Sequence, residues 1–169
     1  RDELGATDFL GYDTERSEGQ ILALVNDGSR VQLLKTGERG YLIANQTPFY
    51  GESGGQIGDI GTIYTEGIVA TVTDTQKRVG DLYVHSITVD IGTLHVGDEV
   101  SLEVDSLRRG AIRANHSATH LVHEALRRRL GNHLTQKGSL VGADRMRFDV
   151  SHNKAITTEE IGLVEDDVN

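Results

Sequence analysis

The 169-residue sequence predicts a mainly β protein, an antiparallel β-barrel followed by a smaller α+β part. Glycine occurs 20 times and proline once, a composition that favours many short strands joined by glycine turns. Strand-like alternation of apolar and polar residues dominates the first part of the chain, whereas the later spacing is helical. We therefore expect a β-barrel domain over residues 1–107 and the beginning of an α+β domain over residues 108–169.

Short apolar or alternating runs mark the strands of the expected barrel. Residues 21–25 are continuously apolar, as in a buried strand. The sequence Asn-Asp-Gly-Ser at 26–29 is typical of a hairpin turn, after which the strand pattern resumes at residues 31–34. Further strands are expected at residues 41–44, 68–73 and 100–105. This spacing indicates a closed or nearly closed antiparallel barrel.

The second domain is expected to open with a helix over residues 114–130. Leu121, Ala125 and Leu126 recur at helical spacing, and Gly131 supplies a C-terminal stop. Two strands of a new sheet follow at residues 139–141 and 146–150. A Thr–Glu capping box then opens a last helix over residues 157–169.

The composition is that of a soluble globular chain, with 37% hydrophobic and 25% charged residues. No cysteine is present, which excludes disulfides and thiolate metal ligands in this sequence. No apolar run reaches the roughly 20 residues needed to cross a bilayer, and we see no secretory signal, so we expect a cytoplasmic protein. The chain begins at Arg1 and its last helix is interrupted at Asn169, so we expect a piece of a longer protein, with apolar surface that favours self-association.

Charge is distributed unevenly along the chain. The formal net charge of −9 divides into −9 for residues 1–100, +4 for residues 101–150 and −4 for residues 151–169. The positive middle block would attract the phosphate backbone of a nucleic acid. A solvated helix face with a local excess of arginine has the same composition, and charge alone favours that interpretation.

Of the seven histidines, His116 and His120 lie four residues apart on the expected helix. This spacing puts their β-carbons about 5–6 Å apart on one face, where two imidazoles can hold one zinc ion. His120 with His123 is a geometric alternative. A pair of this kind is by itself more often structural, and a zinc site needs a third protein ligand, for which His133 or His152 would have to come close in the fold.

A glycine-rich segment covers residues 47–59 with the sequence TPFYGESGGQIGD. Its glycines permit positive φ and a close approach of the backbone to a phosphate, sugar or carbonyl oxygen. The segment lacks the lysine of a Walker loop, and no helix follows it as a dinucleotide fingerprint requires. A long hairpin connection would explain the same glycines, and physics alone slightly favours that interpretation.

Three segments, taken together and in this order, resemble the alanyl-tRNA synthetase family. They are the glycine-rich segment 47–59, the helical sequence RANHSATHLVH at 113–123, and the stretches QKGSLV and RFDVSH at 136–141 and 147–152. The resemblance covers nearly the whole chain. It implies a barrel like that of translation elongation factors, leading into an editing domain that hydrolyses wrongly charged tRNA.

The resemblance also implies roles for individual residues. His116 and His120 correspond to the first half of a zinc site, whose second half, a later C-x-x-x-H, has no counterpart in this sequence. Thr119 and Gln136 correspond to catalytic-site residues that recognise a serine hydroxyl. Binding of the substrate, at the mouth of the site or along the tRNA backbone, is implied for Glu52, Ser53, Gly54, Gly55, Arg113, Lys137 and, as further backbone contacts, Arg127–Arg129.

The expected function is that of a fragment of the ligase that attaches alanine to tRNA(Ala) with ATP. ATP and Mg²⁺ would bind in an aminoacylation part that lies before Arg1, whereas this region would hydrolyse Ser-tRNA(Ala) and Gly-tRNA(Ala). With half of the zinc ligands, the isolated chain is expected to be inactive. The alternatives are a free-standing deacylase that acts in trans, against which the missing methionine and C-x-x-x-H argue, and a non-catalytic tRNA-binding module.

Overall fold

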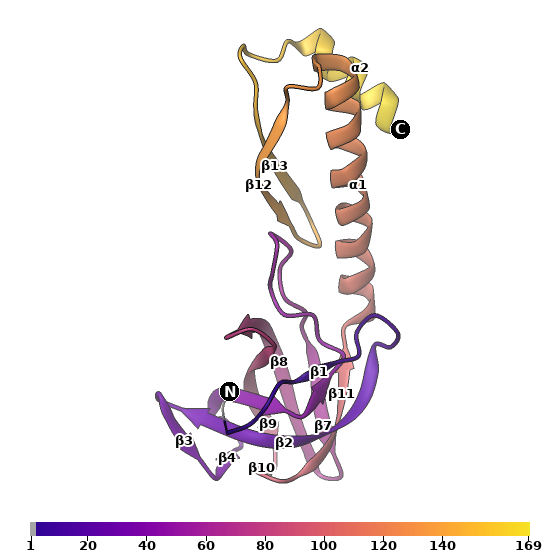
Figure 1. Cartoon of the computed structure of the whole chain (residues 1–169). Helices are drawn as coiled ribbons and strands as arrows, with labels where there is room; N and C mark the ends of the chain where they lie inside the picture. The colour runs from indigo at the N-terminus through magenta and orange to yellow at the C-terminus, as the bar shows by residue number, and fades with distance from the viewer. Residues whose placement is uncertain (1–2) are drawn as a thin grey trace. The chain divides into compact units, whose positions relative to one another are not determined.

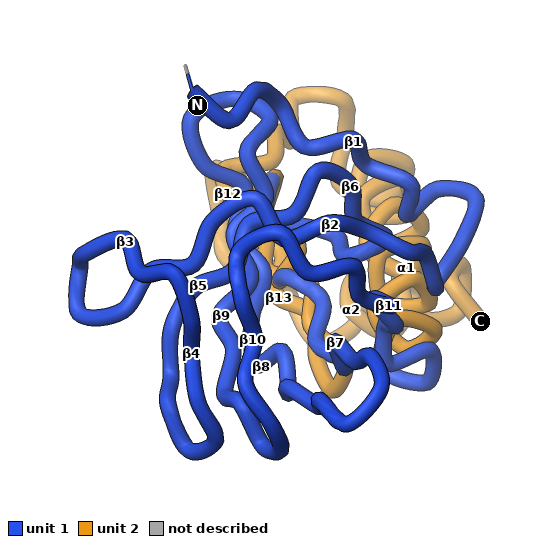
Figure 2. The backbone as a smooth tube through the Cα atoms, turned by 90° about the horizontal axis from the view of Figure 1, so that it is seen from below, with its two compact units in different colours: residues 1–53, 58–108 blue, residues 54–57, 109–169 orange. Residues whose placement is uncertain are grey.

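The computed structural model describes residues 3–169. It divides into two compact units, one formed by residues 1–53 and 58–108 and the other by residues 54–57 and 109–169 (Figure 2). The short segment 54–57, from the glycine-rich stretch, therefore groups with residues that follow it by more than fifty positions. Within residues 3–169, no helix is long and apolar enough to cross a membrane.

The first unit is a closed antiparallel barrel of six strands, which confirms the predicted fold class. The strands pair in the order β11-β7-β8-β9-β5-β2, and pairing of β11 with β2 closes the ring (Figure 1). The strands of this unit are β1 (Asp8–Phe9), β2 (Arg16–Asn26), β3 (Ser29–Val31), β4 (Leu33–Lys35), β5 (Arg39–Ala44), β6 (Gln46–Thr47), β7 (Gly61–Thr65), β8 (Ile68–Arg78), β9 (Leu82–Ile91), β10 (Thr93–His95) and β11 (Glu99–Val104).

The hairpin predicted from residues 26–29 is confirmed. Asn26 of β2 pairs with Ser29 of β3, and the two loop residues Asp27 and Gly28 have φ of 48° and 78°. Two consecutive left-handed residues make the type I′ turn that matches the twist of the flanking strands. The strand expected over residues 31–34 is divided, because β3 pairs with β2 whereas β4 pairs with β10.

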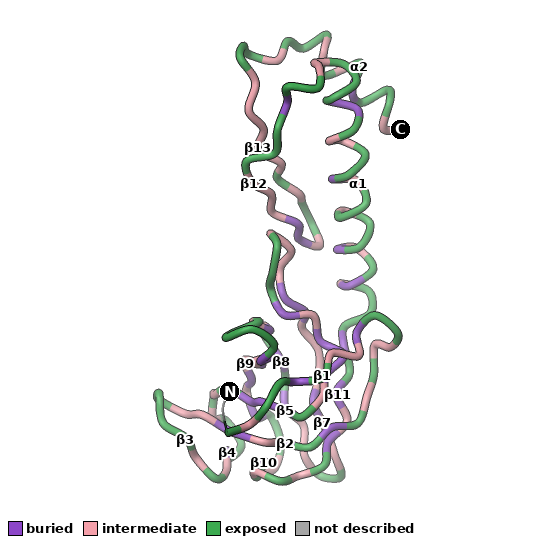
Figure 3. The backbone as a smooth tube through the Cα atoms, viewed as in Figure 1, coloured by how far each residue is buried: buried purple, intermediate pink, exposed green. Residues whose placement is uncertain are grey.

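Alternation along the strands fills the barrel with aliphatic side chains. Buried residues alternate with more exposed ones along β8, β11 and most of β9, whereas β2 and β5 also contain consecutive buried residues (Figure 3). The fully enclosed members of this core include Ile21, Leu24, Leu34, Leu42, Phe49, Ile63, Val72, Val89, Leu94 and Leu102. Burial of this apolar surface is the main source of the barrel's stability.

The second unit combines helix α1 (Ser106–Leu130), the antiparallel hairpin of β12 (Thr135–Val141) and β13 (Met146–Ser151), and helix α2 (Thr158–Val168). Helix α1 begins at Ser106, earlier than the predicted residue 114, because the Asp105 carboxylate accepts a hydrogen bond from the Arg108 N–H (2.9 Å) and caps the helix. It ends as predicted at Leu130, before Gly131, where φ is 113° and the N–H donates to the Arg127 carbonyl (3.0 Å).

A small apolar core joins the elements of the second unit. Ala125 and Leu126 of α1 are buried as their spacing predicts, whereas Leu121 is 55% exposed and Val122 takes its place against the core. The predicted capping box of α2 is confirmed, since the Thr157 side chain accepts from the Glu160 N–H and the Glu160 carboxylate accepts from the Thr157 N–H.

Candidate functional site

The paired histidines of helix α1 face each other. The Nε2 atoms of His116 and His120 are 3.0 Å apart, and their ring centroids are separated by 4.9 Å. Two nitrogens bound to one tetrahedral zinc at about 2.0–2.1 Å would lie roughly 3.3 Å apart. One helical turn of spacing has therefore brought two imidazole nitrogens close to the separation that a shared metal ion requires.

Gln56 determines which nitrogen of His116 carries the proton. The Nδ1 atom of His116 lies 3.0 Å from the Gln56 Oε1 atom, which can only accept a hydrogen bond. The proton therefore resides on Nδ1, and the lone pair of Nε2 points toward His120. A metal-binding histidine needs this tautomer, with its other nitrogen donating to an oxygen.

The glycine-rich segment reaches this helix because it is bonded to strand β12. The Val141 N–H donates to the Gly55 carbonyl (2.8 Å), and the Ile57 N–H donates to the Val141 carbonyl (3.1 Å). Gly55 has φ of 85°, and a β-carbon there would lie 2.4 Å from the Ser139 carbonyl oxygen. Only glycine allows this approach, which carries Gln56 to His116.

A cavity of about 90 Å³ opens beside the histidine pair. It is smaller than the roughly 150 Å³ cavity that accepts benzene, so it suits a side chain of few atoms. Both predicted catalytic residues, Thr119 and Gln136, line it together with the histidine pair. The full lining is Gly54, His116, Thr119, His120, His123, Gln136, Ser139, Val141 and Phe148.

Thr119 is buried with its hydroxyl fixed in direction. Its Oγ1 donates to the Asn115 carbonyl one turn earlier (2.8 Å) and lies 3.3 Å from the sulfur of Met146. The Asn115 amide in turn donates to the Gly142 carbonyl (2.8 Å) in the β12–β13 turn. Because the Thr119 proton is engaged, the oxygen is left to accept a hydrogen bond from a group in the cavity.

A β-bulge in strand β12 separates Gln136 from its neighbour Lys137. Gln136 pairs with Val150 and Gly138 pairs with Asp149, so Lys137 is the extra residue of the strand. A bulge re-aims the side chains next to it, a device that is frequent beside active sites. Both residues are exposed, but Gln136 lines the cavity and Lys137 does not.

Most of the other predicted substrate-binding residues are not part of the cavity lining. Glu52 belongs to the barrel unit, where its carboxylate accepts from the Gln76 amide (2.7 Å), and the Ser53 carbonyl accepts from the Tyr50 hydroxyl (3.1 Å). Arg113 is exposed on α1 one turn before His116. Gly54 alone of the four loop residues lines the cavity, while Gly55 fits against Ser139.

Two imidazole nitrogens suit zinc once the proton between them is displaced, but two ligands are fewer than its protein sites use. Within residues 3–169, no third histidine or carboxylate joins the pair to form a metal-binding group. His123 contacts the Phe148 ring, with centroids 5.2 Å apart. His133 and His152 face each other instead, with Nε2 and Nδ1 3.0 Å apart. Among residues 3–169, this histidine pair therefore supplies two ligands and no other group joins it.

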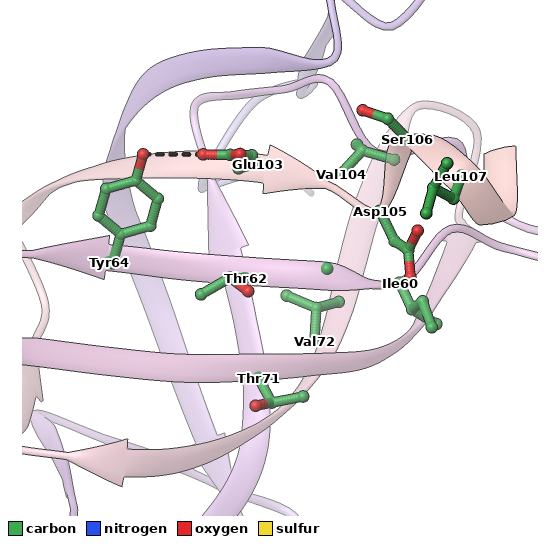
Figure 4. Close-up of a pocket in the computed structure, with 11 residues that line it drawn as sticks. Ile60, Thr62, Tyr64, Thr71, Val72, Glu103, Val104, Asp105, Ser106 and Leu107 are labelled. Carbon is green, nitrogen blue, oxygen red and sulfur yellow. Dashed lines mark hydrogen bonds between the residues drawn. The ribbon is translucent and has the colours of Figure 1, made fainter. Parts of the chain in front are cut away.

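A larger hollow, of about 620 Å³, lies on the barrel and has different chemistry (Figure 4). Its polar contact is the Tyr64 hydroxyl, which donates to the Glu103 carboxylate (2.9 Å) and whose pKa is raised by that bond. The lining contains no histidine. The volume of a hollow therefore does not identify the candidate site. The imidazoles that could bind a metal or transfer a proton line the smaller cavity.

Comparison with known proteins defines the class of this chain. The family model of class II (A) tRNA synthetases matches residues 1–108, and the chain belongs to that family. Among curated relatives, it is 59% identical to the alanine--tRNA ligases of Rhodopseudomonas palustris and Rhizobium meliloti and 57% identical to that of Nitrobacter winogradskyi. The matches cover 100% of this chain and 19% of each relative, and the predicted resemblance to alanyl-tRNA synthetases is confirmed.

Sequence reasoning missed part of the site. Gln56 lies in the glycine-rich segment, but its residue type and position give it no role, and no sequence pattern marks Asn115, Ser139 or Phe148 as site residues. A hydrogen bond between positions 56 and 116 has no local signal, because it depends on how the loop and the hairpin pair. The family resemblance is the one sequence signal that links the two, because the glycine-rich segment and the helix with the histidine pair occur together in that family.

Proposed function

We propose that the chain is a region of a cytoplasmic alanine–tRNA ligase and contributes half of the site that hydrolyses wrongly charged tRNA(Ala). The barrel domain would comprise residues 1–107, and the editing domain would begin at residue 108. The whole ligase would attach alanine to tRNA(Ala) with ATP and Mg²⁺ bound in another part. Identity of 57–59% to alanine--tRNA ligases over the whole chain supports the parent enzyme.

The observation that carries the editing proposal is the state of His116. Its Nδ1–H is held by Gln56, and its Nε2 lone pair faces His120 at 3.0 Å. In the metal-free chain the His120 Nε2–H can donate to this lone pair, and zinc would replace that proton; a metal-binding histidine also needs its other nitrogen held by an oxygen, as Gln56 holds it here. His116 and His120 would hold zinc together with ligands from outside this chain. Zinc bound there would supply Lewis-acid polarisation of a water molecule or an anchor for the substrate's amino group.

The cavity beside the histidines suits the side chain of a small amino acid. Thr119 offers an oxygen that accepts, and the Gln136 amide offers both a donor and an acceptor. A serine hydroxyl would satisfy both groups at once. Alanine would leave them without partners, and a site built around a hydroxyl discriminates strongly against an analogue that lacks it. The alanyl ester would thereby be spared, and the cavity volume limits larger side chains. By the same argument the glycyl ester, which also lacks a hydroxyl, would be hydrolysed less efficiently than the seryl ester.

Contacts to the tRNA backbone are proposed for Arg113 and Lys137, which are exposed on the elements that carry the site. Arg128 and Arg129 are further candidates. Arg128 is bonded to Glu124 (2.9 Å), and Arg129 forms a two-pronged ion pair with Asp167. These arginines already have carboxylate partners within the chain, so part of the positive block of residues 101–150 is neutralised internally.

Zinc binding by the 169-residue chain tests the proposal. Calorimetric titration with zinc should show binding that is lost in the double variant His116→Ala/His120→Ala. Gln56→Ala should weaken it about tenfold, because partners in the second coordination shell typically contribute 10–100-fold to metal affinity. Gln32→Ala, at an exposed barrel position, is the matched control and should leave zinc affinity unchanged.

A deacylation assay with Ser-tRNA(Ala) separates the alternatives. We expect little or no hydrolysis by the chain itself, because half of the ligands are absent from it. Rapid hydrolysis that depends on His116 would instead favour a free-standing deacylase. Zinc affinity that is the same in the parent chain and in the histidine and Gln56 variants would refute the metal-site proposal. The non-catalytic tRNA-binding module would then be the remaining interpretation.

A further inference from the structure

Four aromatic side chains of the barrel unit meet at one place, although the chain has only five tyrosines and three phenylalanines. Phe9 stacks on Tyr83 with centroids 5.2 Å apart and planes 5° apart. Tyr12 meets the same Phe9 ring edge-on at 5.0 Å and 78°, and Tyr50 does so at 6.2 Å and 69°. Phe9 is thus the centre of an aromatic cluster in a chain that is otherwise poor in aromatic residues.

The backbone around Phe9 is shaped to build this cluster. Strand β1 pairs in parallel with β6, which fixes Phe9 opposite Thr47. The Phe9 ring then folds over Gly11, where a β-carbon would lie 2.4 Å from Phe9 Cζ and from the Pro48 carbonyl oxygen. The turn at Gly11 leaves the next residue, Tyr12, with 83% of its surface exposed. Tyr12 therefore has a large exposed ring that packs edge-on against Phe9.

A pocket of about 450 Å³ borders this cluster, within the size range of small-molecule sites. Phe9, Tyr12 and Tyr83 form its aromatic wall. Lys77 contributes an ammonium group 3.2 Å from the Asp81 carboxylate and 5.7 Å from the Tyr83 ring centroid. The full lining is Ala6, Thr7, Asp8, Phe9, Tyr12, Lys77, Asp81 and Tyr83, which gives two carboxylates against one ammonium.

We propose that this pocket binds an unpaired base of RNA, stacked on the exposed ring of Tyr12. Every nucleobase has a flat face for such stacking and an edge of donors and acceptors. The carboxylates of Asp8 and Asp81 would accept from base amino or imino groups, and Lys77 would donate to a base carbonyl or ring nitrogen. The net negative lining disfavours a phosphate in the pocket, so the base and not the backbone is the occupant. The choice of RNA rests on the proposed function.

A proline-rich peptide is the competing occupant, because such segments also dock on aromatic walls. Its pyrrolidine rings carry no donors or acceptors, so they would cover the Asp8 carboxylate and the Lys77–Asp81 ion pair without adding a hydrogen bond to either. The charged lining therefore favours a base over a proline ring.

The test uses the whole 169-residue chain and a short, fluorescently labelled, unpaired RNA oligonucleotide, with binding followed by anisotropy. Tyr12→Ala should weaken binding about tenfold, the usual loss when one stacked base loses its aromatic partner. Tyr12→Phe, which retains the ring, should bind like the parent chain. Tyr41→Ala removes an exposed tyrosine of β5 outside the pocket and should have no effect. The Tyr12-dependent part should vary little with salt concentration, unlike backbone binding.

Three outcomes would overturn the proposal. Equal affinity of the Tyr12→Ala variant and the parent chain would show that the pocket does not hold the base. Equal binding of a blunt-ended, fully base-paired RNA duplex of the same length would show that no unpaired base is required. Tyr12-dependent binding of a labelled proline-rich peptide, without such binding of RNA, would assign the pocket to a protein partner. The assay involves neither zinc nor ester hydrolysis, so its failure is distinguishable from failure of the editing proposal.

Discussion

His85 is held neutral in the barrel core by a complete set of hydrogen bonds. It is fully buried, and its Nδ1–H donates to the Leu42 carbonyl (3.0 Å). Its Nε2 accepts from the Thr47 hydroxyl (2.8 Å), whose oxygen accepts from the Phe49 N–H (3.1 Å). Burial disfavours the charged form and outweighs the Leu42 carbonyl, which favours it, so the pKa of His85 is lowered to about 4.

Stability should therefore fall on mild acidification. The unfolded chain binds a proton at this histidine below about pH 6.5, whereas the folded chain binds it only near pH 4. The contribution of neutral His85 to the free energy of unfolding is complete above pH 6.5 and is lost as the pH falls toward 4. The free energy of unfolding should fall by about 2 kcal/mol between pH 7 and pH 5. Urea unfolding at both pH values measures it. The His85→Gln variant is expected to show a smaller loss, and an equal loss in both proteins would contradict the assignment.

Val79 adopts a backbone conformation that its side chain disfavours. It has φ of 43° in the turn between β8 and β9, and its side chain is 70% exposed. The left-handed region costs an ordinary residue about 1–2 kcal/mol, and asparagine tolerates it better. Val79→Asn should therefore raise the free energy of unfolding by about 1 kcal/mol, measured by urea titration. Arg78→Asn, at the preceding position without positive φ, should give no gain, and a similar gain there would argue against relief of strain.

At the scale of elements, the first turn of helix α2 depends on Thr157. Its hydroxyl accepts from the Glu160 N–H (3.2 Å), while the Glu160 carboxylate accepts from the Thr157 N–H (2.9 Å). The second bond is the main reason that the pKa of Glu160 is lowered. Thr157→Ala should cost about 1 kcal/mol and speed amide exchange in α2, measured by hydrogen–deuterium exchange. Thr158→Ala, one residue inside the helix, is the control, and equal effects of the two changes would contradict the capping role.

Elements whose signals are local could be predicted from the sequence. Two adjacent residues, Asp27 and Gly28, suffice for a type I′ turn, and Thr157 with Glu160 suffices for a helix start. The first turns of α1 were missed because Gly110 interrupts the helical pattern and the cap at Asp105 precedes it. The bond between Gln56 and His116 was beyond local reasoning, since it depends on the pairing of segment 54–57 with β12. The composition of the site was therefore predictable only through family resemblance.

At the scale of the whole molecule, the chain has two separate sources of stability. The barrel encloses one aliphatic core, which includes Leu24, Leu42 and Leu102. The second unit has a smaller core around Ala125, Leu126, Leu134 and Val164. The barrel core is larger and closed by a ring of strands, whereas the smaller core unites two helices and a hairpin. A unit with less buried apolar surface is less stable, so we expect the second unit to unfold first.

Thermal unfolding should accordingly proceed in two transitions that respond to different substitutions. Thr157→Ala should lower the midpoint of the first transition by about 4–8 °C, the shift expected for about 1 kcal/mol in a unit of this size, and leave the second unchanged. Val79→Asn should raise the second by a similar amount and leave the first unchanged. Scanning calorimetry resolves the two midpoints, and circular dichroism identifies the helical loss with the first. A single transition that both substitutions shift would show that the two cores unfold as one cooperative structure, because effects confined to independent units cannot combine in one midpoint.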